Sequence, residues 1–212
     1  MESAVMKILA LAVLASIASA KQEKDIVVAV QQNYKPEIDN LLIEQIQREL
    51  TASYIYQAYA SYFQRADVSL PGIQKFFADA SLEERGHAEK LIDYVNKRGG
   101  HAKFDTLDVS QSTTQNPADR EGWKEGLMAF EDALVIERFV NAKLLQLHAE
   151  ADTAGDGHLG HILEHDFLDE QVHAIYEIGQ HVFRLRKFAS GDGRNYKLGE
   201  YLFDESLQKK SA

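Results

Sequence analysis

The sequence predicts an all-α protein, a four-helix bundle with one long crossover connection and a short fifth helix at the C-terminal end. Over most of the 212 residues, apolar side chains recur at steps of three and four, which places them on one face of a helix. The 3 prolines lie at or outside the ends of these stretches, so none interrupts a helix. The chain has no cysteine, so disulfides do not hold the fold together.

The first two long helices are bounded by residues that begin and end helices. Pro36 precedes an unbroken stretch that reaches Ala66. Ser69 is predicted as the N-cap of a second helix with Pro71 in its first turn, and Gly99-Gly100 ends that helix. The segment 101–116 is polar with few apolar residues, which predicts the long connection.

The second half of the chain predicts two further long helices and the short one. A third helix follows Pro117 and runs to about Ala154, where Gly155-Asp156-Gly157 breaks the chain. A fourth helix spans about 158–188, and a short apolar helix spans about 196–207. Helices of this number and length pack as a bundle.

Residues 1–20 predict a secretory signal peptide, which leaves residues 21–212 as one helical domain. Lys7 precedes an apolar run over 8–17, and Ala18-Ser19-Ala20 fits the small residues of a cleavage site. A membrane anchor is the alternative, but the run is shorter than the roughly 20 apolar residues of a spanning helix. We therefore expect a secreted protein with no membrane partner after cleavage. Two methionines can serve as the start: Met1 and Met6.

The charge and composition exclude several kinds of function. The chain carries 23 Lys and Arg against 33 Asp and Glu, and removal of residues 1–20 leaves the formal charge of −10 unchanged. An acidic chain repels the nucleic-acid backbone, so no nucleic-acid partner is expected. Without cysteine, zinc ribbons, iron–sulfur clusters and thiol nucleophiles are excluded, and metal ligands must be oxygen or nitrogen atoms. Nothing around Met128 indicates a haem.

Each long helix places a metal-capable polar side chain near the middle of its apolar stripe. These are Glu49 in the first helix, Glu84 and His87 in the second, Glu137 in the third and Gln171 in the fourth. A neighbouring hydroxyl or backbone group can satisfy any one of them alone. A lone buried carboxylate is costly, however, so four such insertions at comparable depth predict a shared cation. Three carboxylates, one imidazole and one amide suit iron.

Two Glu-x-x-His motifs occur, and the sequence distinguishes them. Glu84 and His87 have the spacing of acid and imidazole ligands in di-iron helical bundles. Glu170 and His173 repeat this spacing, but the stripe that they share with Asp166 reads as polar and is predicted to face solvent. Three nearby histidines have a spacing compatible with zinc, although a polar helix start explains them equally well: His158, His161 and His165.

Five stretches of the chain resemble the eukaryotic ferritins, in the same order. They are RELTASYIY at 48–56, EERGHAEKL at 83–91, RGG at 98–100, DEQV at 169–172 and EYLFD at 200–204. The resemblance covers nearly all of residues 30–207 and implies a ferritin-like di-iron domain over 21–212. It also implies a shell of 24 subunits, a homo- or hetero-oligomer, that oxidises Fe(II) with dioxygen and stores iron as a ferric mineral.

The resemblance to heavy-type ferritin subunits implies a ferroxidase centre at six positions: Glu49, Tyr56, Glu84, His87, Glu137 and Gln171. It implies two Fe(II) there, with Glu84 bridging them. Glu49 and His87 would bind one iron, and Glu137 would bind the other with Gln171 nearby. The tyrosine of this set would form a hydrogen bond or donate an electron.

Two further sets of positions follow from the same resemblance. The positions of a channel for iron are His148, His161 and Glu164, and those of mineral nucleation are Glu83 and Glu89. His161 stands where the family has aspartate, and Gly86 stands where many heavy-type chains have an acidic residue. The alternative is a light-type subunit, which builds the shell without ferroxidase activity of its own. The complete set of six ferroxidase positions favours the heavy type.

Overall fold

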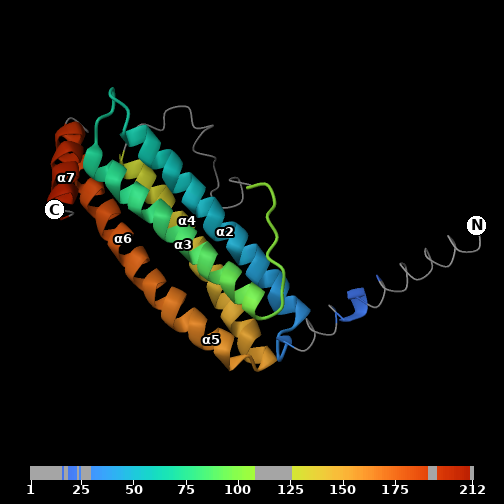
Figure 1. Cartoon of the computed structure of the whole chain (residues 1–212). Helices are drawn as coiled ribbons and strands as arrows, with labels where there is room; N and C mark the ends of the chain where they lie inside the picture. Colours follow the sequence, from blue (N-terminus) through green and yellow to red (C-terminus); the bar gives the residue numbers. More distant parts are fainter. Residues whose placement is uncertain are drawn as a thin grey trace, which may run out of the picture.

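The computed structural model describes residues 16, 19–22, 24, 30–107, 126–190 and 195–210. Its elements are α2 (Pro36–Phe63), α3 (Pro71–Lys97), α4 (Gly126–Ala154), α5 (Gly157–Leu163), η2 (Glu164–Leu168), α6 (Asp169–Ala189) and α7 (Tyr196–Lys210). Figure 1 shows α2, α3, α4 and the α5–α6 segment side by side in a bundle, with α7 at one end. The predicted all-α bundle with a short C-terminal helix is confirmed.

Aromatic rings pack in the interior of the bundle, and two hydrogen bonds join α2 to α3. The Phe77 ring lies 5.8 Å from that of Tyr56 and 5.0 Å from that of Phe130, measured between centroids. Ser53 Oγ donates to the Ser81 carbonyl at 2.7 Å, and Ser81 Oγ donates to the Ser53 carbonyl at 2.8 Å. These reciprocal bonds fix the height of α2 against α3 next to the predicted metal-binding residues.

Most helix ends in the described part of the chain lie at the predicted breaks, but two differ. The first helix, α2, ends at Phe63 and not at the predicted Ala66, because residues 64–68 form a turn. Gly99 and Gly155 have φ of 77° and 71°, a left-handed conformation that favours glycine, and they follow the ends of α3 and α4. Pro71 begins α3, as predicted. Ser69 is not the N-cap, because Leu70 occupies that position and its side chain makes no capping bond. The prediction was wrong because Ser69 has a left-handed φ of 51°, whereas an N-cap residue has an extended backbone.

Two buried carboxylates of α7 supply the acceptors that the starts of α3 and α4 need. Asp204 Oδ1 accepts a hydrogen bond from the Ile73 amide at 2.8 Å. Glu200 Oε1 accepts one from the Gly126 amide at 2.6 Å. A carboxylate near a helix N-terminus satisfies an unpaired amide and interacts favourably with the helix dipole. The short helix therefore stabilises the ends of two long ones.

Replacing Asp204 with alanine is expected to destabilise the protein by about 1–3 kcal/mol, because it leaves the buried Ile73 amide without its acceptor. Asp204→Asn should lose less, since its carbonyl oxygen still accepts the bond. Thermal unfolding of the assembled protein measures both effects, with Glu205→Ala as a control on the half-buried neighbouring residue. Equal stability of Asp204→Ala and the unchanged protein would show that this bond does not hold α7.

The fourth long helix contains a π turn that the sequence did not predict. The turn covers Glu164–Leu168 and joins α5 to α6. Leu163, Phe167 and Gln171 are all buried, at steps of four residues. An uninterrupted α-helix drifts at such steps, whereas the wider π turn keeps the three side chains on the inner face. After the turn, Gln171 faces the interior of the bundle, as predicted.

Three predicted features lie outside the described residues. They are most of the signal peptide, residues 108–116 of the long connection and the start of the third helix. Within the described ranges, no helix combines the length and the apolar character needed to cross a membrane.

Candidate metal centre

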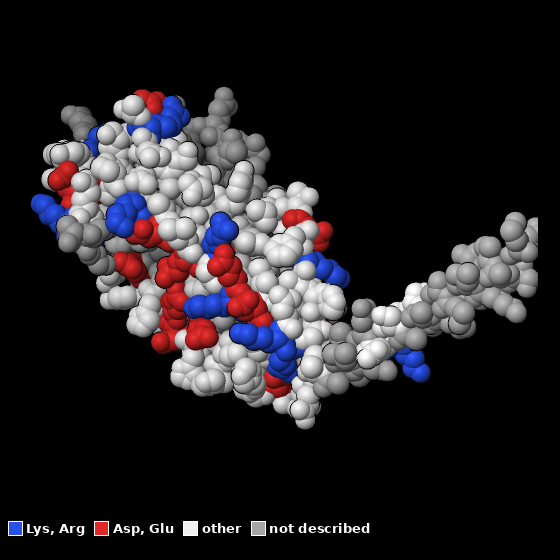
Figure 2. Space-filling model, in the orientation of Figure 1, with Lys and Arg blue, Asp and Glu red and all other residues white. Residues whose placement is uncertain are grey.

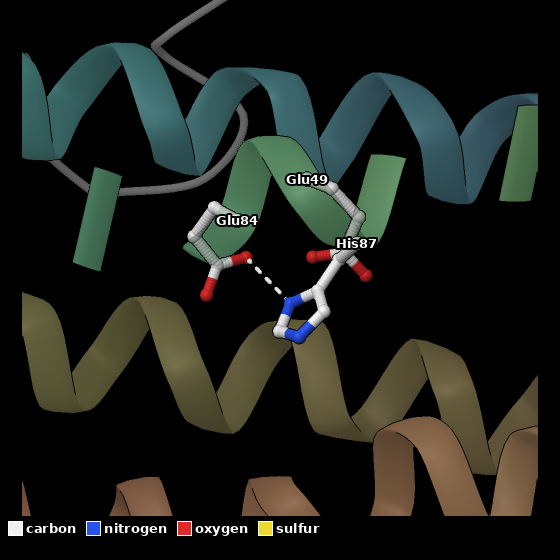
Figure 3. Close-up of side chains that lie close together, drawn as sticks. All are labelled: Glu49, Glu84 and His87. Carbon is white, nitrogen blue, oxygen red and sulfur yellow. Dashed lines mark ion pairs between the residues drawn. The ribbon is translucent and has the colours of Figure 1, made fainter. Parts of the chain in front are cut away.

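Three predicted ligands from two helices meet inside the bundle. Glu49 comes from α2, and Glu84 and His87 come from α3. One ligand atom of each lies within 4.8 Å of the other two, and all three residues are buried. Figure 3 shows their side chains close together, with a dashed line between Glu84 and His87. The two atoms of this pair, His87 Nδ1 and Glu84 Oε2, are 3.7 Å apart. Two oxygen ligands and one nitrogen ligand therefore face a common point.

The other two long helices add polar groups to the same region. Glu137 of α4 accepts hydrogen bonds from the Tyr56 hydroxyl and, at 2.9 Å, from Gln171 Nε2 of α6. A cavity of about 390 Å³ is lined by residues of both groups, among them Glu84, His87, Glu137 and Gln171. The structure thus brings together groups that are far apart in sequence and come from all four long helices.

Gln45 belongs to this cluster, although the sequence analysis did not include it. Its side chain is 1% exposed, and its Nε2 donates to Glu49 Oε1 at 2.8 Å. This bond orients Glu49 and leaves the other carboxylate oxygen for a ligand. The signal in the sequence was an amide one helical turn before an inward-facing acid.

Burial makes the carboxylates of the centre hard to ionise. Burial raises the pKa of Glu49 well above its usual value, and the nearby charge of Glu84 raises it further. Burial and the charge of Glu137 likewise raise the pKa of Glu84. The pKa of Glu137 is raised by burial, although its hydrogen bonds from Tyr56 and Gln171 oppose this. A divalent cation would replace the missing solvation of these oxygens.

Among the described residues, four buried oxygen atoms of this cluster have no hydrogen-bond partner: Gln45 Oε1, Glu49 Oε2, Glu84 Oε2 and Gln171 Oε1. Buried polar atoms in proteins are nearly always paired, so orphan oxygen atoms gathered in one place require an explanation. Each of these oxygen atoms has a lone pair that a metal ion could accept. The donor set of carboxylate, amide and imidazole fits ferrous iron, which binds both oxygen and nitrogen ligands.

Glu170 lies at the centre and not on a solvated stripe, so that prediction was wrong. Its side chain is 34% exposed and its Oε2 lies 2.9 Å from His87 Nε2. The hydrogen bond with His87 lowers the pKa of Glu170 to about 2. The error arose because Glu170 borders the buried stripe that contains Gln171, so its long side chain reaches His87 from the edge of the polar face. His173 remains exposed, as predicted.

The predicted nucleation residues lie on the outer side of α3, next to the centre. Burial and a hydrogen bond with Glu170 raise the pKa of Glu83 to about 7. Glu89 is exposed and pairs with Arg85 at 3.2 Å. Figure 2 shows acidic side chains gathered over α3 and α6 on the face that it draws, with Lys and Arg among them. Gly86, which lies between these two acids in the sequence, is half-buried.

The predicted channel residues lie near the junction of α4, α5 and η2. His148 Nε2 is 2.9 Å from Glu164 Oε1, and His148 Nδ1 is 3.5 Å from Asp152 Oδ2. The His161 ring packs against the His165 ring, with 4.4 Å between centroids. Imidazoles and carboxylates therefore gather at this end of the bundle, well separated in sequence from the ligands on α2 and α3.

Comparison with known proteins finds one family along most of the chain. The Ferritin-like domain matches residues 39–188. The yolk ferritin of Lymnaea stagnalis is 50% identical, with 90% of this chain and 92% of the relative covered. The soma ferritin of the same organism is 41% identical, with 85% and 96% covered, and the ferritin middle subunit of Salmo salar is 40% identical, with 83% and 94% covered. The chain therefore belongs to the eukaryotic ferritins, a family of iron-storage proteins.

Proposed function

We propose that this chain is a heavy-type ferritin subunit that oxidises Fe(II) with dioxygen at a di-iron centre within each subunit. The observation that supports this most strongly is the gathering of acids, an imidazole and amides from four helices in one region with four orphan oxygen atoms. A shell-building subunit without ferroxidase activity would have no need of such a costly buried cluster.

Each residue of the centre has a distinct part in the proposed reaction, in which Fe(II) is a substrate. Glu84 would bridge two ferrous ions, with Glu49 and His87 on the first. Glu137 would bind the second, with Gln171 alongside. Together the two ions supply two electrons, which reduce one dioxygen to the peroxide level. The protein contributes geometry and negative charge, and binding of the ions displaces protons from carboxyl groups whose pKa is raised.

Tyr56 is proposed to steady the second iron site. Its hydroxyl donates to Glu137, and burial together with that carboxylate raises its pKa well above the usual value. The phenol therefore stays protonated and keeps Glu137 in place. Tyr56 could also give one electron to dioxygen at the centre, while its proton passes to Glu137 along their hydrogen bond.

The proposal extends to the assembly and its surroundings. Twenty-four subunits, identical or mixed, would enclose a ferric mineral, and Fe(II) would reach the interior past His148, His161 and Glu164. Residues 1–20 would direct the chain to the secretory pathway and be removed. Size-exclusion mass and an Fe(II) oxidation curve on residues 21–212 test this together. A shell that oxidises Fe(II) no faster than buffer would favour the light-type alternative.

Gly86→Glu is expected to speed mineral growth, because it adds a carboxylate between Glu83 and Glu89 on the proposed nucleation surface. A Cβ atom at position 86 would meet nothing within 4 Å, so the backbone has room for a side chain to begin there. Gly86→Ala is the matched control, since both changes stabilise the helix by about 0.5–1 kcal/mol but only one adds charge. Light scattering and iron retention after loading measure growth. Equal mineral growth in the two variants would show that acids on this surface do not take part in nucleation.

A further inference from the structure

We propose that Glu170 is a positioning residue, which holds His87 so that its Nδ1 faces the metal. This inference rests on the proposed function, because it concerns how one ligand of the proposed centre is oriented. It gives a role to the second Glu-x-x-His motif, which the sequence analysis assigned to a solvated stripe.

The two nitrogen atoms of the His87 ring face different carboxylates. Nδ1 faces Glu84 Oε2 at 3.7 Å, on the side of the metal ligands. Nε2 lies 2.9 Å from Glu170 Oε2, on the far side of the ring. The oxygen of Glu170 therefore contacts the edge of the imidazole that does not face the centre.

This arrangement determines which nitrogen atom carries the proton. A carboxylate can only accept a hydrogen bond, so Nε2 must be the donor. In a neutral imidazole the lone pair is then on Nδ1, which is the form that binds a metal ion. Histidine ligands in metal sites commonly donate their second N–H to a carboxylate, which fixes the tautomer and the ring orientation.

The π turn places two residues against the His87 ring. The Phe167 ring, within the turn, lies 5.5 Å from the imidazole centroid. Glu170 follows two residues after the end of the turn and is only partly exposed, at 34%. One contact limits the tilt of the ring and the other limits its rotation. The π turn and the residues after it therefore help to orient the His87 ring.

The test compares Glu170→Ala and Glu170→Gln in the assembled protein, with His173→Ala as an exposed control on the same helix. The probe is Co²⁺, which is redox-stable and whose visible absorption reports histidine ligation. Glu170→Ala should weaken the first Co²⁺ site by 10–100-fold, the range for loss of such a partner. Glu170→Gln should bind within about threefold of the unchanged protein, because its amide oxygen still accepts from Nε2. His173→Ala should not change binding.

The outcomes separate this inference from the proposed function. Unchanged Co²⁺ affinity in Glu170→Ala would overturn the positioning role while leaving the centre itself intact. Equally weak Co²⁺ binding by Glu170→Gln and Glu170→Ala would also overturn the positioning role. The charge of Glu170, and not its hydrogen bond with His87, would then determine the affinity. Failure of the unchanged protein to bind Co²⁺ or oxidise Fe(II) would reject the proposed function itself. Glu170→Ser replaces the alanine variant if that variant does not assemble.

Discussion

Replacing Glu84 and His87 together with alanine should abolish rapid oxygen-dependent oxidation of Fe(II). Glu84 is the proposed bridge between the two ions and His87 supplies the imidazole of the Glu49–Glu84–His87 cluster, so neither ion keeps its ligand set. We expect the initial rate to fall by more than about 100-fold, because even the indirect partners of metal ligands are worth 10–100-fold. Stopped-flow absorbance at limiting Fe(II) measures the rate.

The double variant should lose iron oxidation but keep its assembly and its thermal stability. Both side chains are buried, and replacing them removes a buried acid, so assembly and thermal stability should persist. Asp93→Ala with Lys97→Ala is the matched control, because these residues are exposed on the same helix. A double variant that oxidises iron at the unchanged rate would mean that oxidation happens elsewhere in the assembly.

The iron-free protein should lose stability as the pH rises from about 5 to 8. Glu49, Glu84, Glu137 and His87 all have a raised pKa in the folded state. For His87, burial lowers the pKa, but the hydrogen bond with Glu170 and the charge of Glu49 outweigh it. A group with a raised folded-state pKa holds more protons when folded than when unfolded. Its stabilisation is complete below the unfolded pKa and is lost as pH rises through the folded one.

Thermal unfolding of the iron-free protein across this range tests the sign. One pKa unit is worth about 1.4 kcal/mol, and each kcal/mol shifts Tm by about 2–4 °C in a chain of this size. Glu170, whose pKa is lowered to about 2, acts in the opposite sense but only below about pH 4.5. Glu49→Gln with Glu84→Gln should flatten the profile, and Co²⁺ should restore stability at pH 8. Stability that rises from pH 5 to 8 would contradict the burial of these acids.

The helices could be predicted from the sequence because their signals are local. Pro71, Gly99 and Gly155 mark helix ends through their own backbone preferences, and the structure has helix ends at each of them. The acceptor at the start of α3 could not be predicted, because Asp204, which binds the Ile73 amide, comes from the far end of the chain. A contact of that kind leaves no trace in the local sequence.

The residues brought together at the centre were identifiable because a buried acid in an apolar stripe stands out in a helix. The error over Glu170 arose because it lies beside the buried Gln171, at the edge of the polar face of α6. Periodicity assigns a residue to a face, but it does not show that a long side chain at the edge of that face contacts a ligand on another helix. Gln45 was missed for a different reason, since an amide next to an acid on a helix is ordinary in surface stripes.

The most direct test of the di-iron centre is the stoichiometry of the fast phase. Fe(II) is added in steps to the assembled iron-free protein, and the rapid absorbance change is recorded with the dioxygen consumed. We expect the amplitude of the rapid absorbance change to grow linearly with added Fe(II) and to stop growing at two iron ions per subunit, with one dioxygen used for every two ions. A fast phase that saturates at one ion, or that never saturates, would contradict a paired site built from Glu49, Glu84, His87 and Glu137.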